Sequence, residues 1–156
     1  MIRWMTMELW AAGNLPERTL TLKVLEEMRT RADEYGAKWD SMKERLPPAM
    51  VDAVSRLRDA ELLSVHADAA RAEVRLTVRP WNAPPERWVF KGARRHEWIN
   101  HQLALSGPPG FGHFGYSEFE VPPDGFSMAI LFSSGLESVV RAADFGIEDV
   151  ALPFGA

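Results

Sequence analysis

The spacing of apolar residues changes once along this chain, and that change constrains the fold more than any other feature of the sequence. Up to about residue 58, apolar residues recur every three or four positions, as they do on one face of a helix. Beyond it they alternate with polar residues, as Val74, Leu76 and Val78 do, which is typical of half-buried strands. Helices followed by strands indicate an α+β fold.

The helical part, residues 1–58, is expected to contain about three helices. The first is predicted to run from Pro16, which suits a first helical position, to Gly36, which suits the position just after a last turn. Its apolar stripe consists of Leu22, Leu25, Met28, Ala32 and Tyr35. Two shorter helices are predicted at 39–46 and, after a pair of prolines interrupts the pattern, at 48–57.

The mainly β part, residues 59–156, is expected to form a mostly antiparallel sheet of roughly six strands. Alternating apolar residues and the turn residues between them predict strands at 63–66, 74–79, 87–91, 116–121, 126–132 and 136–142. A chain of 156 residues has the length of one domain. We therefore expect residues 1–156 to form a single domain in which the helices pack on this sheet.

The absence of cysteine excludes several kinds of chemistry. A chain without cysteine has no disulfide, no thiolate nucleophile and no cysteine-type zinc site. The net charge of −4 argues against general nucleic-acid binding, which needs a basic face. The sequence contains no signal-like segment and no membrane-spanning run of roughly 18 apolar residues. We therefore expect a cytoplasmic protein with neither a nucleic-acid nor a membrane partner.

The histidines show no spacing that predicts a metal site. They form no H-x-H, H-x-x-x-H or H-E-x-x-H pattern, and they are His66, His96, His101 and His113. The glycine- and proline-rich segment 107–115 lacks the lysine and hydroxyl residue of a phosphate loop. It is expected to be a connection that either covers the sheet or contacts a partner. We accordingly predict no metal and no cofactor.

Two glutamates on one predicted strand come closest to a catalytic arrangement. Glu118 and Glu120 lie two residues apart, so both carboxylates are expected on the same face of the strand. Paired carboxylates can act as general acid and general base. An enzyme would need His96, His101 or His113 to meet them in a pocket. The alternative is a solvated face of the sheet, and no catalytic residue is assigned.

The C-terminal part of the chain is acidic, and from residue 117 onward Arg141 is its only basic residue. The acids expected to form a surface for a partner are Glu118, Glu120, Asp124, Glu137 and Asp144. Trp81, in a proline-bearing loop, is expected to be the most exposed tryptophan, and exposed aromatic residues favour protein binding. The basic cluster at 87–95 is expected to be a solvated surface, with anion binding as the alternative.

Four stretches of the sequence are similar to motifs of one bacterial family. Residues 1–10 (MIRWMTMELW) resemble its aromatic-Thr-x-Glu-aromatic start, and residues 57–65 (LRDAELLSV) its Leu-His-Asp-Ala-x-Val-x-Ser-Val junction. Residues 116–120 (YSEFE) and 130–135 (ILFSSG) resemble a Tyr-Asp-Glu-aromatic-Glu strand and an Ile-Leu-Phe-Ser-Asp-Gly hairpin. The family is catalogued as domain-of-unknown-function 4085. The resemblance implies no established activity, but small acidic cytoplasmic proteins of a similar helix-plus-sheet layout occur among bacterial toxin-immunity proteins.

We therefore predict a non-enzymatic protein-binding protein of the immunity or antitoxin type, which presents its acidic surface to a basic protein such as a toxin nuclease. One alternative is a small hydrolase-like enzyme that uses Glu118 and Glu120 with a histidine. The other is a structural homo-oligomer, held together by an exposed tryptophan or an unpaired sheet edge.

Overall fold

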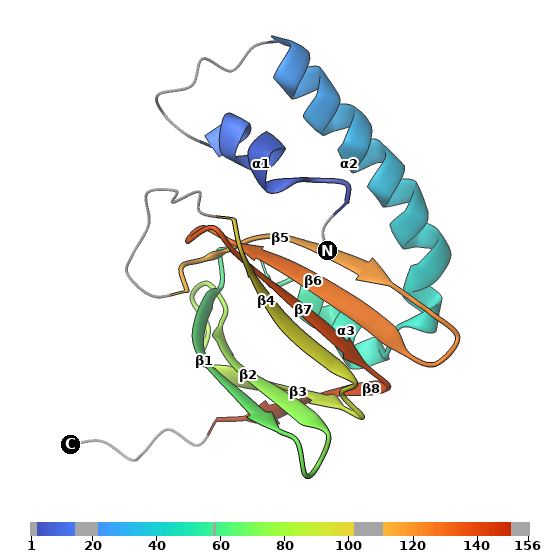
Figure 1. Ribbon diagram of the computed structural model, residues 1–156, viewed down its shortest axis with the longest axis vertical. Helices are drawn as coiled ribbons and strands as arrows, with labels where there is room; N and C mark the ends of the chain where they lie inside the picture. The colour runs from blue at the N-terminus through green and yellow to red at the C-terminus, as the bar shows by residue number, and fades with distance from the viewer. Residues whose placement is uncertain (1–2, 15–21, 58, 102–110, 151–156) are drawn as a thin grey trace, which may run out of the picture.

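Helices come first in this structure and strands follow, as the change in apolar spacing predicts. The computed structural model describes residues 3–14, 22–57, 59–101 and 111–150. The helices are α1 (Met7–Asn14), α2 (Leu22–Met42), the 3-10 turn η1 (Lys43–Arg45) and α3 (Pro48–Val54). The strands are β1 (Glu61–Asp68), β2 (Glu73–Arg79), β3 (Glu86–Lys91), β4 (Arg95–Asn100), β5 (Phe114–Glu120), β6 (Phe126–Phe132), β7 (Leu136–Ala142) and β8 (Asp144–Asp149). The α+β class is confirmed (Figure 1).

The long helix α2 does not end where the sequence predicts. It continues past Gly36 to Met42 and takes in part of the segment predicted as a second helix, so the predicted helix end is wrong. A glycine inside a helix costs only about 1 kcal/mol relative to alanine, which packing further along can offset. Tyr35, Trp39 and Met42 supply that packing, because they lie at steps of four and three and pack into the core. The predicted start at Pro16 lies outside the described residues.

The other end of α2 leaves part of its predicted apolar stripe in solvent. Leu22 is 85% exposed and Leu25 is 46% exposed, because this end extends beyond the sheets (Figure 1). Apolar spacing shows which residues share a helix face, but it does not show how far the surface opposite them extends. Of the helices that the structure describes, none is both long enough and apolar enough to cross a membrane.

The short helix α1 is not among the predicted helices. It starts after Thr6, whose hydroxyl accepts a hydrogen bond from the Leu9 N–H at 3.4 Å, in the manner of an N-cap. Trp10 donates its N–H to the Thr6 carbonyl at 2.9 Å and closes the first turn. The threonine was a signal for this helix start, but eight residues are too few to show a helical period clearly.

The strands form two antiparallel sheets of four strands each, so the prediction of a single sheet of roughly six strands is wrong. The first sheet has the order β1-β2-β3-β8, and the second sheet has the order β4-β7-β6-β5. All six predicted strands exist. The two additional strands, β4 and β8, each continue the strand before them after a bend.

One ladder of backbone hydrogen bonds passes through both bends and connects the two sheets. Lys91 pairs with Asp144 at the end of the first sheet, and Arg95 pairs with Arg141 at the start of the second. Between them, the Ala143 N–H donates to the Lys91 carbonyl at 3.0 Å. Strands that bend in this way can serve two packed sheets. The bend requires a glycine at position 92, because its φ is +61°.

The main core lies between the two sheets and is rich in aromatic side chains. Phe90 of the first sheet and Phe126 of the second have ring centroids 6.1 Å apart, and Trp88 and Phe114 are at the same distance. Residues of α3, including Met50 and Ala53, belong to the same buried cluster. The hydrophobic residues at alternate positions in the strands therefore face the space between the sheets.

The outer face of the second sheet, which points away from the first sheet, has its own cover. Ala129, Leu131 and Val139 are buried there, and Trp10 of α1 packs against them. A β-carbon at Gly115 would lie 2.3 Å from the Trp10 ring, so the backbone of β5 needs a glycine there. Helices α1 and α2 lie on this side of the second sheet (Figure 1).

The bend at residue 92 provides a stability test. In a Gly92→Ala variant the new β-carbon would have a left-handed φ and would lie 2.9 Å from the Ala143 β-carbon. We expect chemical denaturation to show a loss of about 2 kcal/mol in the free energy of unfolding. Gly36→Ala is the matched control, because nothing lies within 4 Å of its added carbon, and it should gain about 0.5–1 kcal/mol. Equal effects in the two variants would contradict the role of the bend.

Candidate functional site

Glu118 is buried and holds the N-terminal segment against the second sheet. This residue is only 6% exposed to solvent. Its carboxylate accepts hydrogen bonds from the backbone N–H groups of Arg3 at 2.7 Å, Trp4 at 2.6 Å and Met5 at 3.0 Å. Three amide donors compensate a buried carboxylate well. This glutamate is therefore a structural anchor and not part of an accessible acidic surface.

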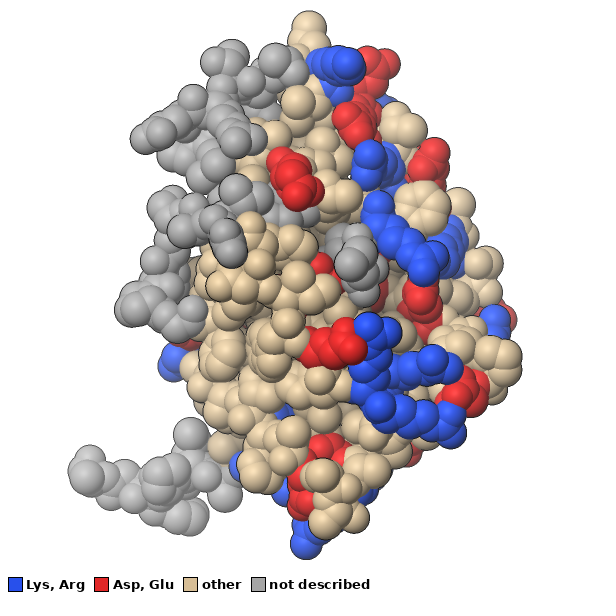
Figure 2. Space-filling view, viewed as in Figure 1, with Lys and Arg blue, Asp and Glu red and all other residues tan. Residues whose placement is uncertain are grey.

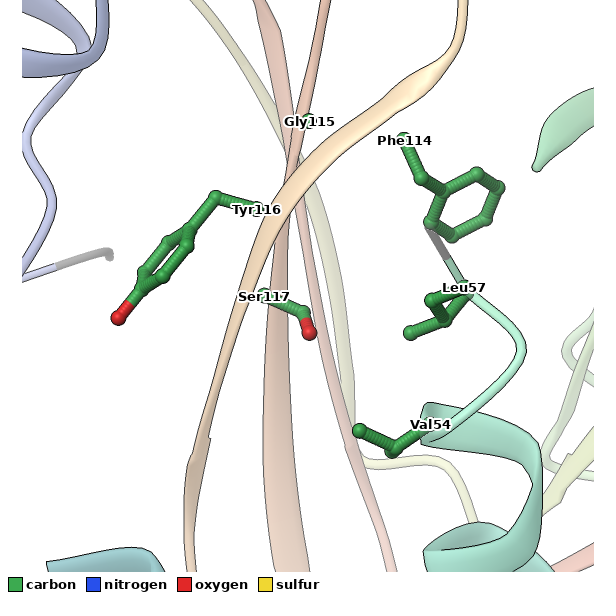
Figure 3. A pocket seen from close by; sticks show the side chains of 6 residues that line it. All are labelled: Val54, Leu57, Phe114, Gly115, Tyr116 and Ser117. Carbon is green, nitrogen blue, oxygen red and sulfur yellow. The ribbon is translucent and has the colours of Figure 1, made fainter. Parts of the chain in front are cut away.

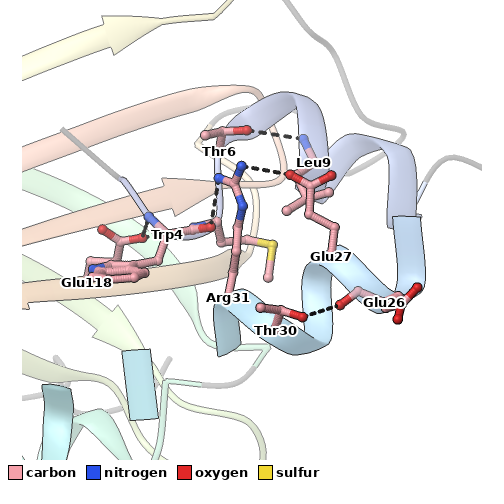
Figure 4. Close-up of polar contacts among 9 residues, drawn as sticks. Trp4, Thr6, Leu9, Glu26, Glu27, Thr30, Arg31 and Glu118 are labelled. Atoms are coloured by element: carbon pink, nitrogen blue, oxygen red, sulfur yellow. Dashed lines mark hydrogen bonds and ion pairs between the residues drawn. The ribbon is translucent and has the colours of Figure 1, made fainter. Parts of the chain in front are cut away.

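Helix α2 holds the same segment from the other side (Figure 4). Arg31 donates from its guanidinium to the Trp4 carbonyl at 3.3 Å, and the same guanidinium pairs with Glu27 at 2.7 Å. The Lys38 ammonium lies 5.8 Å from the centre of the Trp4 ring. The segment is thus attached both to the sheet and to the long helix.

Glu120 does not form a catalytic pair with Glu118. Its carboxylate pairs with the Arg3 guanidinium at 3.3 Å, and both side chains are well exposed. Contacts of both glutamates with Arg3 agree with the prediction that they share one face of β5. Within the described part of the chain, no histidine forms a hydrogen bond or ion pair with either glutamate. The constellation that the enzyme hypothesis needs is absent there.

Glu137 is also buried, with an exposure of 1%. Its carboxylate lies 2.8 Å from Nε2 of His101. His101 comes directly after β4, the strand that pairs with the β7 strand of Glu137. The backbone brings them together, because Ile99 pairs with Glu137 and the His101 N–H donates to the Gly135 carbonyl at 3.0 Å. A carboxylate in this position orients the imidazole ring. No pattern in the sequence indicates this pair, since 36 residues separate its members.

Asp124 is surrounded by positive charge. It lies in the turn before β6, where Arg141 donates to one of its oxygens at 2.6 Å and Arg94 donates to the other. The hydrogen bond from Arg141, together with the charges of both arginines, holds the pKa of this carboxyl below its ordinary value. The surface at this point is basic and not acidic.

The five predicted acids therefore do not form one accessible acidic surface. Glu118 and Glu137 are buried, and Glu120 and Asp124 are neutralised by arginines. Asp144 is exposed, but it lies opposite Lys91 in the ladder. The acids are clustered in the sequence, whereas their basic partners come from distant parts of the chain.

Trp81 is the most exposed of the six tryptophans, as predicted, with an exposure of 70%. It follows the buried Pro80 in a tight turn, in which the Ala83 N–H donates to the Pro80 carbonyl at 3.3 Å. Asn82 has a left-handed φ of +56°, a conformation that asparagine tolerates. The turn therefore presents a large aromatic side chain on a constrained backbone.

A pocket of about 330 Å³ lies beside Trp81. Glu61 and Arg79 form part of its wall and are paired at 2.7 Å across β1 and β2. His113 also lines the pocket, and its backbone forms an isolated antiparallel β-bridge with that of Glu61. The surface around Trp81 thus combines an exposed ring with hydrogen-bonding groups.

A second, more apolar pocket of about 240 Å³ lies where α3 meets β5 (Figure 3). Val54, Leu57 and Ser117 face it, whereas the Tyr116 side chain points to the other side of β5 (Figure 3). The nearby Phe114 is buried in the core. This pocket has few groups that could recognise a ligand by hydrogen bonding.

The described end of the segment 107–115 covers the sheet. Phe111 stacks on Trp98 with ring centroids 5.3 Å apart, and Phe114 contacts Phe132 at 5.0 Å. Residues 107–110 lie outside the described residues.

His96 lies half-buried on β4. Burial lowers the pKa of His96, whose ring lies 3.5 Å from the Ser138 hydroxyl. In residues 3–14, 22–57, 59–101 and 111–150, no group of three or more histidine, aspartate and glutamate side chains could hold a metal ion.

No protein-family model matches the chain, and no curated protein matches it. Membership of domain-of-unknown-function family 4085 remains a prediction. The features of the site therefore have to be interpreted from their own geometry.

The anchoring role of Glu118 can be tested by a conservative substitution. Glu118→Gln keeps the size of the side chain but removes the charge and places an amide donor next to the N–H groups of residues 3–5. We expect a loss of about 1.5–3 kcal/mol in the free energy of unfolding and faster amide exchange at Trp4 and Met5. Glu120→Gln, two residues along the same strand, should change both little because its ion pair is exposed. Unchanged exchange in the Glu118 variant would contradict the role.

The two tyrosines of the chain should lower the free energy of unfolding at high pH. Tyr35 accepts a hydrogen bond from the Phe119 N–H at 2.8 Å, and its ring lies 6.1 Å from that of Tyr116. Burial raises the pKa of both phenols above the ordinary value of 10.0. A raised folded-state pKa stabilises the fold below the unfolded-state pKa, and this contribution declines as pH rises above it.

Absorbance at 295 nm should therefore show no tyrosinate near pH 10 while the protein is folded. The free energy of unfolding should fall as the pH rises above that value. Tyr35→Phe should halve the absorbance change on alkaline unfolding, because the chain has only two tyrosines. Ordinary titration of both phenols in the folded protein would show that they are not buried.

Proposed function

We propose that this chain is a non-enzymatic protein-binding protein and that it meets its partner through Trp81 and the pocket beside it. The observation that carries the proposal is the 70% exposure of Trp81 on a constrained turn. Exposed tryptophans are enriched among residues that dominate binding energy, because they bury a large area at a small cost in conformational entropy.

The neighbouring surface supports the same interpretation. The edge strand β1 of the first sheet contributes Glu61 to the pocket beside Trp81, and Leu63 on the same strand is 39% exposed. The Glu61–Arg79 ion pair at the pocket supplies one negative and one positive charge. Polar groups of this kind surround the apolar centre of a typical protein interface. The acidic surface proposed from the sequence plays no part in this proposal.

The role of an immunity or antitoxin-like inhibitor in the cytoplasm is a more specific form of this proposal. It comes from the resemblance to small bacterial proteins and from the lack of a catalytic constellation in the described residues. A gene for a toxin beside the gene for this chain, and binding of the encoded toxin by the purified protein, would support it. A neighbouring gene product that does not bind would oppose it.

The Trp81 surface can be tested by site-specific cross-linking. A photoreactive amino acid at position 81 should capture one protein partner, whereas the same amino acid at position 22, which is also exposed, should not. With the captured partner purified, Trp81→Ala should weaken binding by roughly 30-fold, the effect of removing a dominant interface residue. Leu22→Ala is the control and should leave binding unchanged.

Three results would contradict the proposal. They are capture of the same proteins at both positions, unchanged affinity in the Trp81 variant, and cross-linking of the chain only to a second copy of itself. The last would favour the homo-oligomer alternative.

A further inference from the structure

Three arginines meet where the second sheet begins, and we name Arg94, Arg95 and Arg141 the arginine corner. Arg95 on β4 lies directly opposite Arg141 on β7, so both side chains project from the outer face of the second sheet. Arg94 joins them because its N–H donates to the Arg141 carbonyl at 2.9 Å. Like charges in directly opposite positions repel and destabilise a sheet. Figure 2 shows basic side chains gathered over the ends of β4 and β7.

The carboxylates nearby do not use all the donors of the corner. Asp124 accepts one hydrogen bond from Arg94 and one from Arg141, the latter at 2.6 Å, and Glu97 accepts one from Arg95 at 2.5 Å. Two carboxylates therefore face three guanidinium groups, and each guanidinium carries five N–H donors. The Arg94, Arg95 and Arg141 side chains are 57%, 58% and 42% exposed. Donors and positive charge remain accessible at the surface.

Asp124 also holds two of these side chains in place. It bonds Arg94 with one oxygen and Arg141 with the other, so both guanidiniums are oriented before any ligand arrives. Its turn is closed by a hydrogen bond from the Gly125 N–H to the Pro122 carbonyl at 3.4 Å. Oriented guanidinium groups bind planar and tetrahedral oxyanions through paired N–H donors at a reduced entropic cost.

The outer face is the side on which an anion fits. A hollow of about 290 Å³ on the other side of Arg94 and Arg95 is also bordered by Asp68 and Glu73, whose carboxylates repel anions. On the outer face, the cross-strand neighbour of Arg141 in β6 is the small, uncharged Ser127. The carboxylates at the corner, Asp124 and Glu97, are already bonded to arginines, so three guanidinium groups against two carboxylates leave positive charge for an anion between Arg95 and Arg141.

We propose that the arginine corner binds a phosphate group, as inorganic phosphate or as a phosphate monoester, through Arg95 and Arg141, with Arg94 adding charge. A phosphate dianion relieves the repulsion between the opposed arginines and accepts hydrogen bonds from both. The site lies apart from the Trp81 surface and does not rest on the proposed protein-binding function.

Isotope-labelled protein can be titrated with inorganic phosphate at constant ionic strength, with chloride as the replaced anion. Nuclear magnetic resonance should show saturable shifts of the backbone signals of residues 94, 95 and 141 and of their side-chain signals. Arg95→Gln should weaken binding by about tenfold, the usual effect of losing a charge-assisted hydrogen bond. Arg87→Gln, a basic residue of the first sheet paired with Glu148, is the matched control and should bind as the unchanged protein does.

A second variant changes binding in the opposite direction. Glu97→Gln removes the carboxylate that competes for Arg95, so phosphate should bind more tightly. This outcome distinguishes a binding site from an arginine cluster with a purely structural role, and neither Arg95 nor Glu97 is buried, so both variants should fold.

A phosphoserine peptide and ribose 5-phosphate, each compared with its unphosphorylated form, identify the source of the group. Tighter binding of either one than of inorganic phosphate shows which larger ligand the corner accepts. Shifts that do not saturate, or that are the same in the Arg95 and Arg87 variants, would overturn the proposal.

Discussion

The ladder that joins β3 and β4 to β8 and β7 is the constraint on which the rest of the structure depends. It is a single run of backbone pairing, bent once, and it forces the chain to build two sheets from what would otherwise be one. The bend makes the two sheets face each other. The aromatic side chains that point inward from alternate positions of the strands therefore pack together in one core. The same bend places Arg94 and Arg95 beside Arg141, so a feature of the backbone determines where charge accumulates.

Charge in this protein is organised by pairs and not by regions. Three of the acids near the C-terminal end meet a partner from elsewhere: Glu118 meets backbone amides of residues 3–5, Glu137 meets His101, and Asp124 meets two arginines. Net charge and its distribution along the sequence say little about such a surface, because folding mixes distant segments. Among the accessible features of the described residues are the Trp81 side chain and the arginine corner.

Much of the fold could be predicted from local patterns, and most of the parts that could not depend on contacts between distant residues. Alternation revealed six strands, because side-chain direction in a strand follows from local geometry. The continuation of α2 through Gly36 and the bend at Gly92 depend on packing against residues far along the chain, which no local pattern contains. The same holds for the candidate site. The exposure of Trp81 followed from its loop, whereas the burial of Glu118 depended on a segment more than a hundred residues earlier.

The attachment of the first residues to Glu118 has a consequence for how freely the sequence there can change. The carboxylate binds main-chain N–H groups, which every amino acid except proline possesses. Most substitutions at positions 3 to 5 leave the three hydrogen bonds available, whereas few side chains other than a carboxylate can accept all three at position 118. This contact therefore depends on the identity of residue 118 and hardly on the identities of residues 3 to 5. Two chains with quite different opening residues could close over the same sheet in the same way, provided that the one acid on β5 is retained.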